Sequence, residues 1–198
     1  MLVVDVHRFT VSPDHGFGRL AAERGITREL GEYYEQVEQA LPNIIRLADA
    51  CRASGLPVIF TRLVADHDAD VTPQARATGF WTSAGSSEAE FAPGLQPHPG
   101  DAVINKTATS GFTSGRLDAL LRDRGIENLI VCGVLANGAV EHTARDAADR
   151  GYGVIVVTDA CGAESWTIGT FVMATLVGGL IRTRSTQAVI EMLNGTRT

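Results

Sequence analysis

The stretch from residue 130 to residue 147 constrains the fold more than any other part of the chain. It opens with an apolar run, residues 130–135, and continues through Ala136-Asn137-Gly138-Ala139 into a segment of small residues. A continuous apolar run is typical of a strand that is buried on both faces of a parallel sheet, and a helix directly after it indicates an α/β fold. The turn between the strand and the helix is where we expect a site.

The rest of the chain repeats this alternation of strands and helices. We predict further strands at residues 1–7, 58–61, 101–104, 154–161 and 181–183. The spacing of apolar residues predicts helices at residues 32–54 and 116–124, after the turn as far as residue 150, from Ser165 or Thr167 onward, and at residues 186–193. The pattern predicts an α/β, Rossmann-like, three-layer αβα fold around a mostly parallel sheet of about six strands.

Several local features qualify this pattern. Pro42 lies inside the first long helix and predicts a kink or a restart there. Residues 10–30 and 62–99 lack periodicity, so we expect irregular loops, and the second loop has the length of a functional one. Its Phe80, Trp81, Phe91 and His98 are candidates for a pocket wall, although packing onto the sheet explains the aromatic residues equally well. In the helix after Ser165, we expect the close-packed side to hold Phe171, Ala174, Thr175 and Gly178.

Length and charge limit the possible classes of protein. With 198 residues, of which 44% are hydrophobic, the chain is long enough for one domain and too short for two typical ones, so we expect a single domain over residues 1–198. A net charge of −6 argues against a nucleic-acid partner. No apolar run reaches the roughly 20 residues of a spanning helix, and the N-terminus lacks signal-peptide features. We therefore expect a cytoplasmic protein without a membrane partner.

The cysteines and the acidic loop residues do not indicate a metal. Cys51, Cys132 and Cys161 lie far apart, and their apolar surroundings predict buried free thiols. The adjacent Asp66-His67-Asp68 would not converge on one ion in an extended loop, so we expect a solvated turn there. We expect neither a metal nor another cofactor.

Three of the predicted strands end in residues that suit a reaction site. Asp5 closes the first strand, Lys106 follows the strand at residues 101–104, and Gly138-Ala139 follows the central strand. Each of the two charged residues, taken alone, is compatible with a solvated strand end, but an isolated buried carboxylate is costly and must be paired or functional. Because ligands bind at the carboxyl ends of strands near a switch point, we expect the three segments to converge on one pocket.

Residues 133–147 resemble the isochorismatase-like hydrolase superfamily, whose segment reads roughly Gly-Val-x-Thr-Asn-x-Cys-Val-x-x-Thr-Ala-Arg-Asp-Ala. The matching positions are Gly133, Val134, Asn137, Val140 and residues 143–147. Asp5-Val6-His7 resembles the Asp-x-Gln of the superfamily, and the segment from Lys106 to Ser110-Gly111-Phe112 resembles its Lys-x-x-x-Ser-Ala/Gly-Phe. The resemblance extends from Met1 to about Leu193 and implies the isochorismatase-like hydrolase fold and a small-molecule substrate.

The resemblance also implies roles for individual residues. In the cysteine-dependent members, the aspartate accepts the thiol proton, the lysine lowers the pKa of the thiol, and the thiolate attacks an amide or ureido carbon. These roles fall on Asp5 and Lys106, but the nucleophile position is Ala139, whose methyl group cannot attack. Cys132 lies in the strand, ahead of the turn, which places it badly for a substitute.

Ala139 leaves several interpretations open. The chain is either an inactivated Cys→Ala form of an amide or ureide hydrolase, or a natural thiol-free member that uses Asp5 and Lys106. Isochorismatases themselves lack the cysteine, so a vinyl ether hydrolase with Asp5 as general acid is an alternative, although Ala136-Asn137 departs from their Ala-His. Another alternative is a non-catalytic binding protein, against which the presence of both Asp5 and Lys106 argues.

Further residues are assigned to substrate binding because they belong to these segments. They are His7, Phe9, Trp81, Phe112, Leu135, Ala136, Asn137, Gly138 and His142. His7 and His142 are also candidates for replacement acid–base chemistry, against their ordinary role as packed or surface histidines. The superfamily tendency implies a homo-oligomer, a dimer or a tetramer, and the apolar residues 172–181 suit a core or an interface equally.

Overall fold

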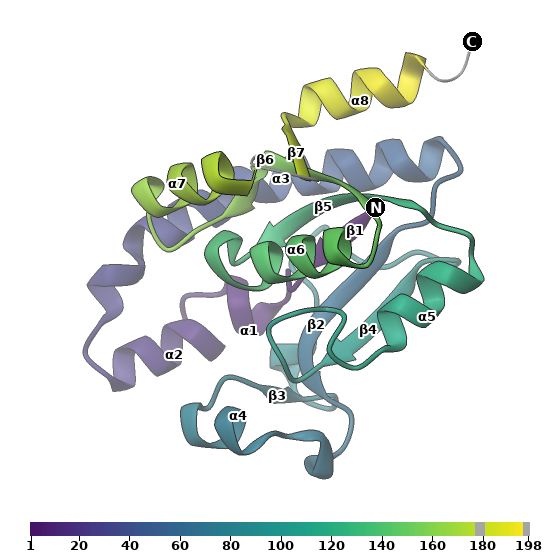
Figure 1. The fold of residues 1–198 in the computed structure, drawn as a ribbon. Coiled ribbons are helices and arrows are strands. Elements are labelled where there is room, and N and C mark those ends of the chain that lie inside the picture. Colours follow the sequence, from purple (N-terminus) through teal and green to yellow (C-terminus); the bar gives the residue numbers. More distant parts are fainter. Residues whose placement is uncertain (177–180, 196–198) are drawn as a thin grey trace.

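A sheet of seven parallel strands forms the middle layer of the molecule (Figure 1). The computed structural model describes residues 1–176 and 181–195. The strands are β1 (Leu2–Val4), β2 (Ile59–Ala65), β3 (Thr82–Ser83), β4 (Ala102–Lys106), β5 (Asn128–Val134), β6 (Gly153–Gly162) and β7 (Ile181–Arg184). Their order is β4-β2-β1-β5-β6-β7, and the short β3 pairs with the carboxyl end of β2. The three-layer α/β prediction is confirmed.

The centre of the sheet is apolar because β1 and β5 are covered on both faces. All residues of β1 are buried, and so are Val131, Cys132 and Val134 of β5. Gly133 pairs with Val4 at a φ of +125°, and a Cβ built on it would lie 2.2 Å from the Val4 carbonyl oxygen. This close approach explains why a glycine interrupts the apolar run.

Helices cover the sheet on both faces. The chain passes from β1 through α3 (Gly31–Ala53) to β2 on one side of β1, whereas it passes from β5 through α6 (Glu141–Asp149) to β6 in the opposite direction. Right-handed crossovers therefore place α3 and α6 on opposite faces, as Figure 1 shows. The connection from β4 to β5 contains α5 (Arg116–Asp123), and α8 (Thr186–Gly195) packs against α3. The direction of the connections reverses between β1 and β5, which makes their carboxyl ends a switch point.

The prediction of an irregular loop at residues 10–30 is wrong. This segment, with the two residues before it, forms α1 (Arg8–Val11), α2 (Gly16–Glu23) and the 3-10 turn η1 (Thr27–Leu30). A Cβ at Gly16 would lie 2.0 Å from the Phe9 carbonyl oxygen, and one at Gly18 would lie 1.7 Å from that of Pro13. These glycines allow α2 to pack closely against α1 and against the connection between the two helices, which a reading of glycine as a loop residue overlooks.

The prediction of a structureless loop at residues 62–99 is also wrong in part. β2 extends to Ala65, and the segment then contains the 3-10 turns η2 (Asp68–Asp70) and η3 (Ser87–Ala89), the helix α4 (Pro73–Thr78) and β3. The Thr72 hydroxyl accepts a hydrogen bond from the Ala75 N–H, Pro73 follows as the first helical residue, and Gly79 ends α4 at a φ of +73°. The helix is too short for periodicity to detect, but its end signals are present.

The remaining helices and strands lie close to their predicted positions, with two corrections. α3 continues through Pro42 as one helix instead of restarting there. In α7 (Trp166–Leu176), for which the Ser165 hydroxyl accepts the Ile168 N–H, Val172 and Leu176 are buried. The packed side predicted at Phe171, Ala174 and Thr175 is wrong because these residues are exposed, and Gly178 lies outside the described residues. Because this helix is apolar on all sides, its sequence lacks the amphipathic pattern that would identify the buried face.

Candidate functional site

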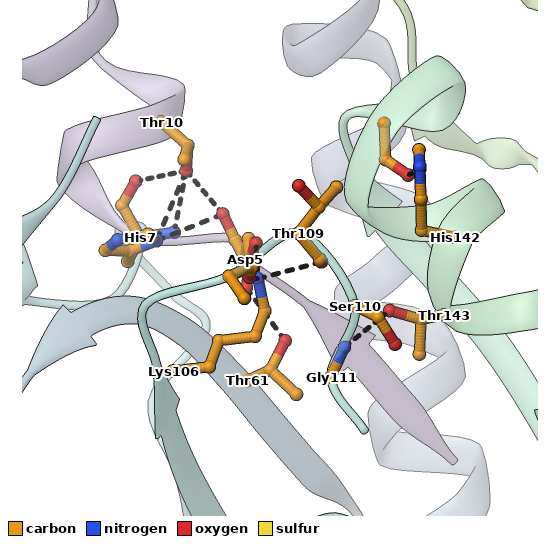
Figure 2. A network of polar contacts seen from close by, with 12 residues as sticks. Asp5, His7, Thr10, Thr61, Lys106, Thr109, Ser110, Gly111, His142 and Thr143 are labelled. Carbon is orange, nitrogen blue, oxygen red and sulfur yellow. Dashed lines mark hydrogen bonds and ion pairs between the residues drawn. The ribbon is translucent and has the colours of Figure 1, made fainter. Parts of the chain in front are cut away.

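The carboxyl ends of β1, β4 and β5 converge at the switch point. Asp5 follows β1 directly, Lys106 is the last residue of β4, and the turn after β5 continues as one wide helical turn, η4 (Ala136–Val140). Figure 2 shows Asp5 and Lys106 pointing toward one another. The parallel register explains this meeting, because β2 pairs with β1 on one side and with β4 on the other.

Asp5 and Lys106 form a buried ion pair. Lys106 Nζ lies 2.6 Å from Asp5 Oδ2, and the two residues are each 3% exposed. The hydroxyl of Thr61 on β2 donates to the second carboxylate oxygen, Oδ1, at 2.8 Å. Lys106 Nζ also donates to the carbonyl oxygens of Ala108, at 2.8 Å, and Thr109, at 3.1 Å. All three ammonium protons of the lysine are therefore engaged, and each oxygen of the carboxylate accepts a hydrogen bond.

The backbone of Asp5 is held in an unusual conformation. Its φ is +55°, in the left-handed region that residues other than glycine seldom adopt. Its carbonyl oxygen accepts hydrogen bonds from the His7 N–H, at 3.1 Å, from His7 Nδ1, at 3.1 Å, and from the Thr10 hydroxyl (Figure 2). These donors hold the peptide that directs the carboxylate toward Lys106.

His7 is a neutral, buried member of this network. Burial lowers its pKa from 6.5 to about 4, so the ring is uncharged near neutral pH. With Nδ1–H donating to the Asp5 carbonyl, the other ring nitrogen is an acceptor. That Nε2 atom has no hydrogen-bond partner within the described part of the chain. His7 thus supports the Asp5 backbone from behind instead of facing the cavity.

The loop after Lys106 is hydrogen-bonded to α6. The Ser110 hydroxyl donates to Asp146 Oδ2 at 2.8 Å, and the Gly111 N–H donates to the buried Thr143 hydroxyl at 3.0 Å. Figure 2 shows Ser110 and Gly111 beside Thr143 of α6. These contacts fix the loop after Lys106 to the helix that follows the turn, and the same loop supplies the two carbonyl oxygens that hold the lysine.

A cavity of about 470 Å³ opens at this point. Its wall includes Asp5 and Lys106, together with Leu135, Gly138 and Ala139 from the turn after β5. The structure thus brings the three predicted segments to one cavity. Across from them, the wall comes from α2, α4 and the end of β2. Phe17, Leu63 and Phe80 contribute its apolar part.

Ala139 presents only a methyl group to this cavity, and none of the three cysteines contributes to its wall. All three are buried. Burial raises the pKa of the Cys161 thiol to about 12 and raises those of Cys51 and Cys132 as well. A buried protonated thiol away from the cavity cannot replace the missing nucleophile.

Several residues predicted to bind substrate lie away from the cavity wall. His7 and Phe9 are fully buried behind it, and Phe9 packs against the edge of Phe17 with the ring centroids 5.5 Å apart. Trp81 packs against a small cluster under α4, and Phe112 is buried against Tyr152. These side chains lie behind the residues that form the wall, so a ligand in the cavity would not contact them.

Residues of the turn after β5 face two different cavities. Ala136 is buried and faces a second cavity, between α3 and α7. The Asn137 side chain accepts the Glu164 N–H, and His142 is exposed with Nδ1 2.9 Å from the Gly138 carbonyl oxygen. In Figure 2, His142 stands apart from the Asp5 network. The structure therefore does not bring these three residues to the cavity that contains Asp5.

The predicted site also lacked some residues that the structure places there. Thr61 is absent from the prediction, although it is a polar residue in a buried strand and pairs with Val4, the residue before Asp5. Thr10 and Phe17 lie in the segment wrongly predicted as a loop. Polar residues near the ends of buried strands provide a signal for Thr61, whereas Phe17 has no comparable signal.

Two negative findings concern the described residues. Within residues 1–176 and 181–195, no group of three or more His, Cys, Asp or Glu side chains is arranged to hold a metal ion. None of the helices in the same ranges has both the length and the apolar character needed to cross a bilayer.

Comparison with known proteins gives consistent matches. A family model described as an isochorismatase domain matches residues 13–185. N-carbamoylsarcosine amidase of an Arthrobacter species is 32% identical over 134 residues, covering 64% of this chain and 50% of that protein. Ureidoacrylate amidohydrolase RutB of Variovorax paradoxus is 32% identical over 138 residues, covering 61% of this chain and 55% of that protein. The matched region thus spans about half the length of these curated relatives.

The fold also matches that of a solved protein. A cysteine hydrolase from Pseudomonas syringae pv. phaseolicola superimposes with a TM-score of 0.83 and 24% identity, covering 98% of this chain and 91% of that one. At this level of identity, the match shows a shared fold.

Proposed function

The chain belongs to the isochorismatase family of hydrolases, and from that premise we propose that it hydrolyses a C–N bond of a small amide or ureide without a thiol. The proposal rests above all on Asp5, a carboxylate in the cavity wall that is oriented by Lys106 and stands in the same wall as Ala139. The names of the relatives, an amidase and an amidohydrolase, support the choice of bond.

In the proposed reaction, a water molecule takes the place that a thiol would occupy at residue 139. Asp5 accepts a proton from the water, and the water oxygen attacks the carbonyl carbon of the substrate. The tetrahedral intermediate then collapses, the C–N bond breaks, and the proton on Asp5 passes to the departing nitrogen. Lys106 holds the carboxylate in position and balances its charge, and no residue becomes covalently bound to the substrate.

The hydrogen bonds of Asp5 favour this role over that of a general acid. Two donors, Lys106 Nζ and the Thr61 hydroxyl, point at its oxygens, so each carboxylate oxygen acts as a hydrogen-bond acceptor. A vinyl ether hydrolase would need the protonated form in its resting state. Vinyl ethers therefore serve as the comparison substrates when the activity is tested.

The test is hydrolysis of a panel of small amides, ureides and vinyl ethers by this chain and by its Asp5→Asn variant. We expect ammonia release from an amide or ureide, and a loss of at least about 100-fold in the variant, the usual contribution of a general base. Asp149→Asn removes an exposed carboxylate at the end of α6 and serves as the matched control. Turnover of vinyl ethers alone would support the acid role instead, and no turnover of any substrate would support a binding protein.

We also propose that the chain acts as a single-domain, cytoplasmic homo-oligomer that associates through α7. On this helix Phe171 is 68% exposed and Trp166 is 46% exposed, and interfaces between subunits bury large apolar side chains of this kind. In size-exclusion chromatography with light scattering, we expect a dimer or tetramer for this chain and a monomer for Phe171→Glu. A monomeric wild-type chain would contradict the proposal.

A further inference from the structure

The charges of the cavity wall are already balanced within the protein. Of the described residues that line the cavity, the charged ones are Asp5 and Lys106, which form the ion pair. A substrate carboxylate entering this cavity would therefore meet one negative and one positive group, both buried and already paired. Burying a further charge without a partner is strongly unfavourable.

Lys106 has no proton left for an anionic ligand. An ammonium group has three N–H donors, and those of Lys106 are directed at Asp5 Oδ2 and at the carbonyl oxygens of Ala108 and Thr109. A carboxylate that bound here would have to displace one of these acceptors. The lysine thus orients Asp5 and is unsuited to hold a second carboxylate.

Of the five threonines that line the cavity, Thr10, Thr78 and Thr107 donate their hydroxyl protons to backbone carbonyl oxygens. The Thr10 hydroxyl shares its proton between the carbonyl oxygens of Asp5 and, at 2.8 Å, His7. The Thr78 hydroxyl donates to the Gln74 carbonyl oxygen and the Thr107 hydroxyl to that of Asp70, both at 2.9 Å. A hydroxyl that donates its proton in this way remains an acceptor. Such groups suit the N–H groups of an amide or a urea, and the Thr72 hydroxyl, which accepts the Ala75 N–H, keeps its proton for the carbonyl oxygen of the same ligand.

The rest of the wall is apolar and partly aromatic. Phe17 and Phe80 meet edge to face with their ring centroids 4.9 Å apart, and Leu63 and Leu135 line the same cavity. Its volume of about 470 Å³ lies within the range of cavities that take a drug-sized molecule and exceeds the needs of a carbamoyl group alone. The net charge of −6 further disfavours the approach of anions.

We propose that the cavity takes an uncharged substrate with an amide or urea head beside Asp5 and an apolar, preferably aromatic, body against Phe17 and Phe80. Carboxylate-bearing ureides, the class to which ureidoacrylate belongs, should bind more weakly than their uncharged counterparts. The identity of the head group rests on the proposed function, whereas the preference for an uncharged ligand rests on the pairing of Asp5 with Lys106.

The test is binding of two matched pairs of probes, measured by ligand-observed NMR and calorimetry. Phenylurea is compared with 4-ureidobenzoate, and phenylacetamide with 4-carboxyphenylacetamide, so that each pair differs by one carboxylate. We expect the neutral member of each pair to bind at least about tenfold more tightly, because the anion lacks a partner in the wall. Equal or tighter binding of the carboxylates, or binding of none of the four probes, would overturn the proposal.

A charge placed at the rim should reverse part of this preference. Gln74 is an exposed residue of α4 that lines the cavity, and we expect Gln74→Arg to tighten binding of 4-ureidobenzoate about threefold while leaving phenylurea unchanged. Gln96→Arg adds the same charge at an exposed site outside this wall and controls for net charge. An equal effect of both variants would contradict a role for the wall.

Ammonia release recorded in the same samples separates this proposal from the proposed function. Tighter binding of the neutral probes without turnover would leave the preference for uncharged ligands in place and contradict the hydrolysis. Turnover of the carboxylates in preference to the neutral probes would support a hydrolase and overturn the inference drawn here.

Discussion

Asp5 and Lys106 depend on one another for their burial. We expect Lys106→Met to lower the free energy of unfolding by about 3–5 kcal/mol, because it leaves a buried carboxylate without its cation. The double variant Asp5→Leu with Lys106→Met should lose less than the sum of the two single variants, since no unpaired charge remains. Urea denaturation of the four proteins checks this, and strictly additive losses would show that the two side chains do not interact.

His7 should make the stability depend on pH. Its pKa is about 4 in the folded chain, against an ordinary value of 6.5, because burial disfavours the charged ring. Between these pH values the unfolded chain binds a proton that the folded chain does not. The free energy of unfolding therefore falls as the pH decreases from 6.5 to about 4, by about 3 kcal/mol in full.

Replacement of this ring isolates its contribution. We expect His7→Asn to remove most of that pH dependence, as measured by urea denaturation at several pH values between 4 and 6.5. The exposed His98, changed to Asn, is the matched control and should leave the slope as it is. If the pH dependence of the free energy of unfolding persisted in His7→Asn, it would have to come from other titratable groups.

At the scale of elements, hydrogen bonds between α6 and the loop after β4 hold in place the loop that supplies two carbonyl oxygens to Lys106. Thr143 is fully buried, and its hydroxyl accepts the Gly111 N–H. We expect Thr143→Val to cost about 1–3 kcal/mol of stability, because it leaves a buried N–H without an acceptor. Hydrogen exchange at the Gly111 amide should accelerate in this variant. Thr113→Val, at an exposed position of the same loop, should change neither quantity.

The elements also show what a single sequence can and cannot predict. The strands and long helices were predicted because burial imposes an apolar run or a helical period on them, as in β5 and α3. The segments around α2 and α4 were missed because their glycines serve close packing and end signals instead of loops. The convergence of Asp5 and Lys106 was predictable from strand ends alone. The division of the turn, with Ala139 toward the cavity and Ala136 away from it, depends on backbone angles that no periodicity encodes.

For the molecule as a whole, the question is whether a hydrolase site can work with a methyl group at residue 139. The described wall holds a carboxylate with its own cation and hydroxyl donor, and the chain's three thiols are buried elsewhere. The proposed general-base hydrolysis uses such an oriented carboxylate and a water molecule, and it needs no thiol. A thiol at residue 139 would add a second route, with a covalent intermediate.

The measurement that tests this most directly is the initial rate of ammonia release from phenylurea by this chain and by Ala139→Cys, each with and without prior treatment with iodoacetamide. Thiol-free hydrolysis predicts that this chain is active and that alkylation leaves its rate unchanged, whereas the cysteine variant loses rate on alkylation. Ammonia release by the untreated cysteine variant alone would contradict the thiol-free mechanism and identify the chain as a disabled thiol hydrolase.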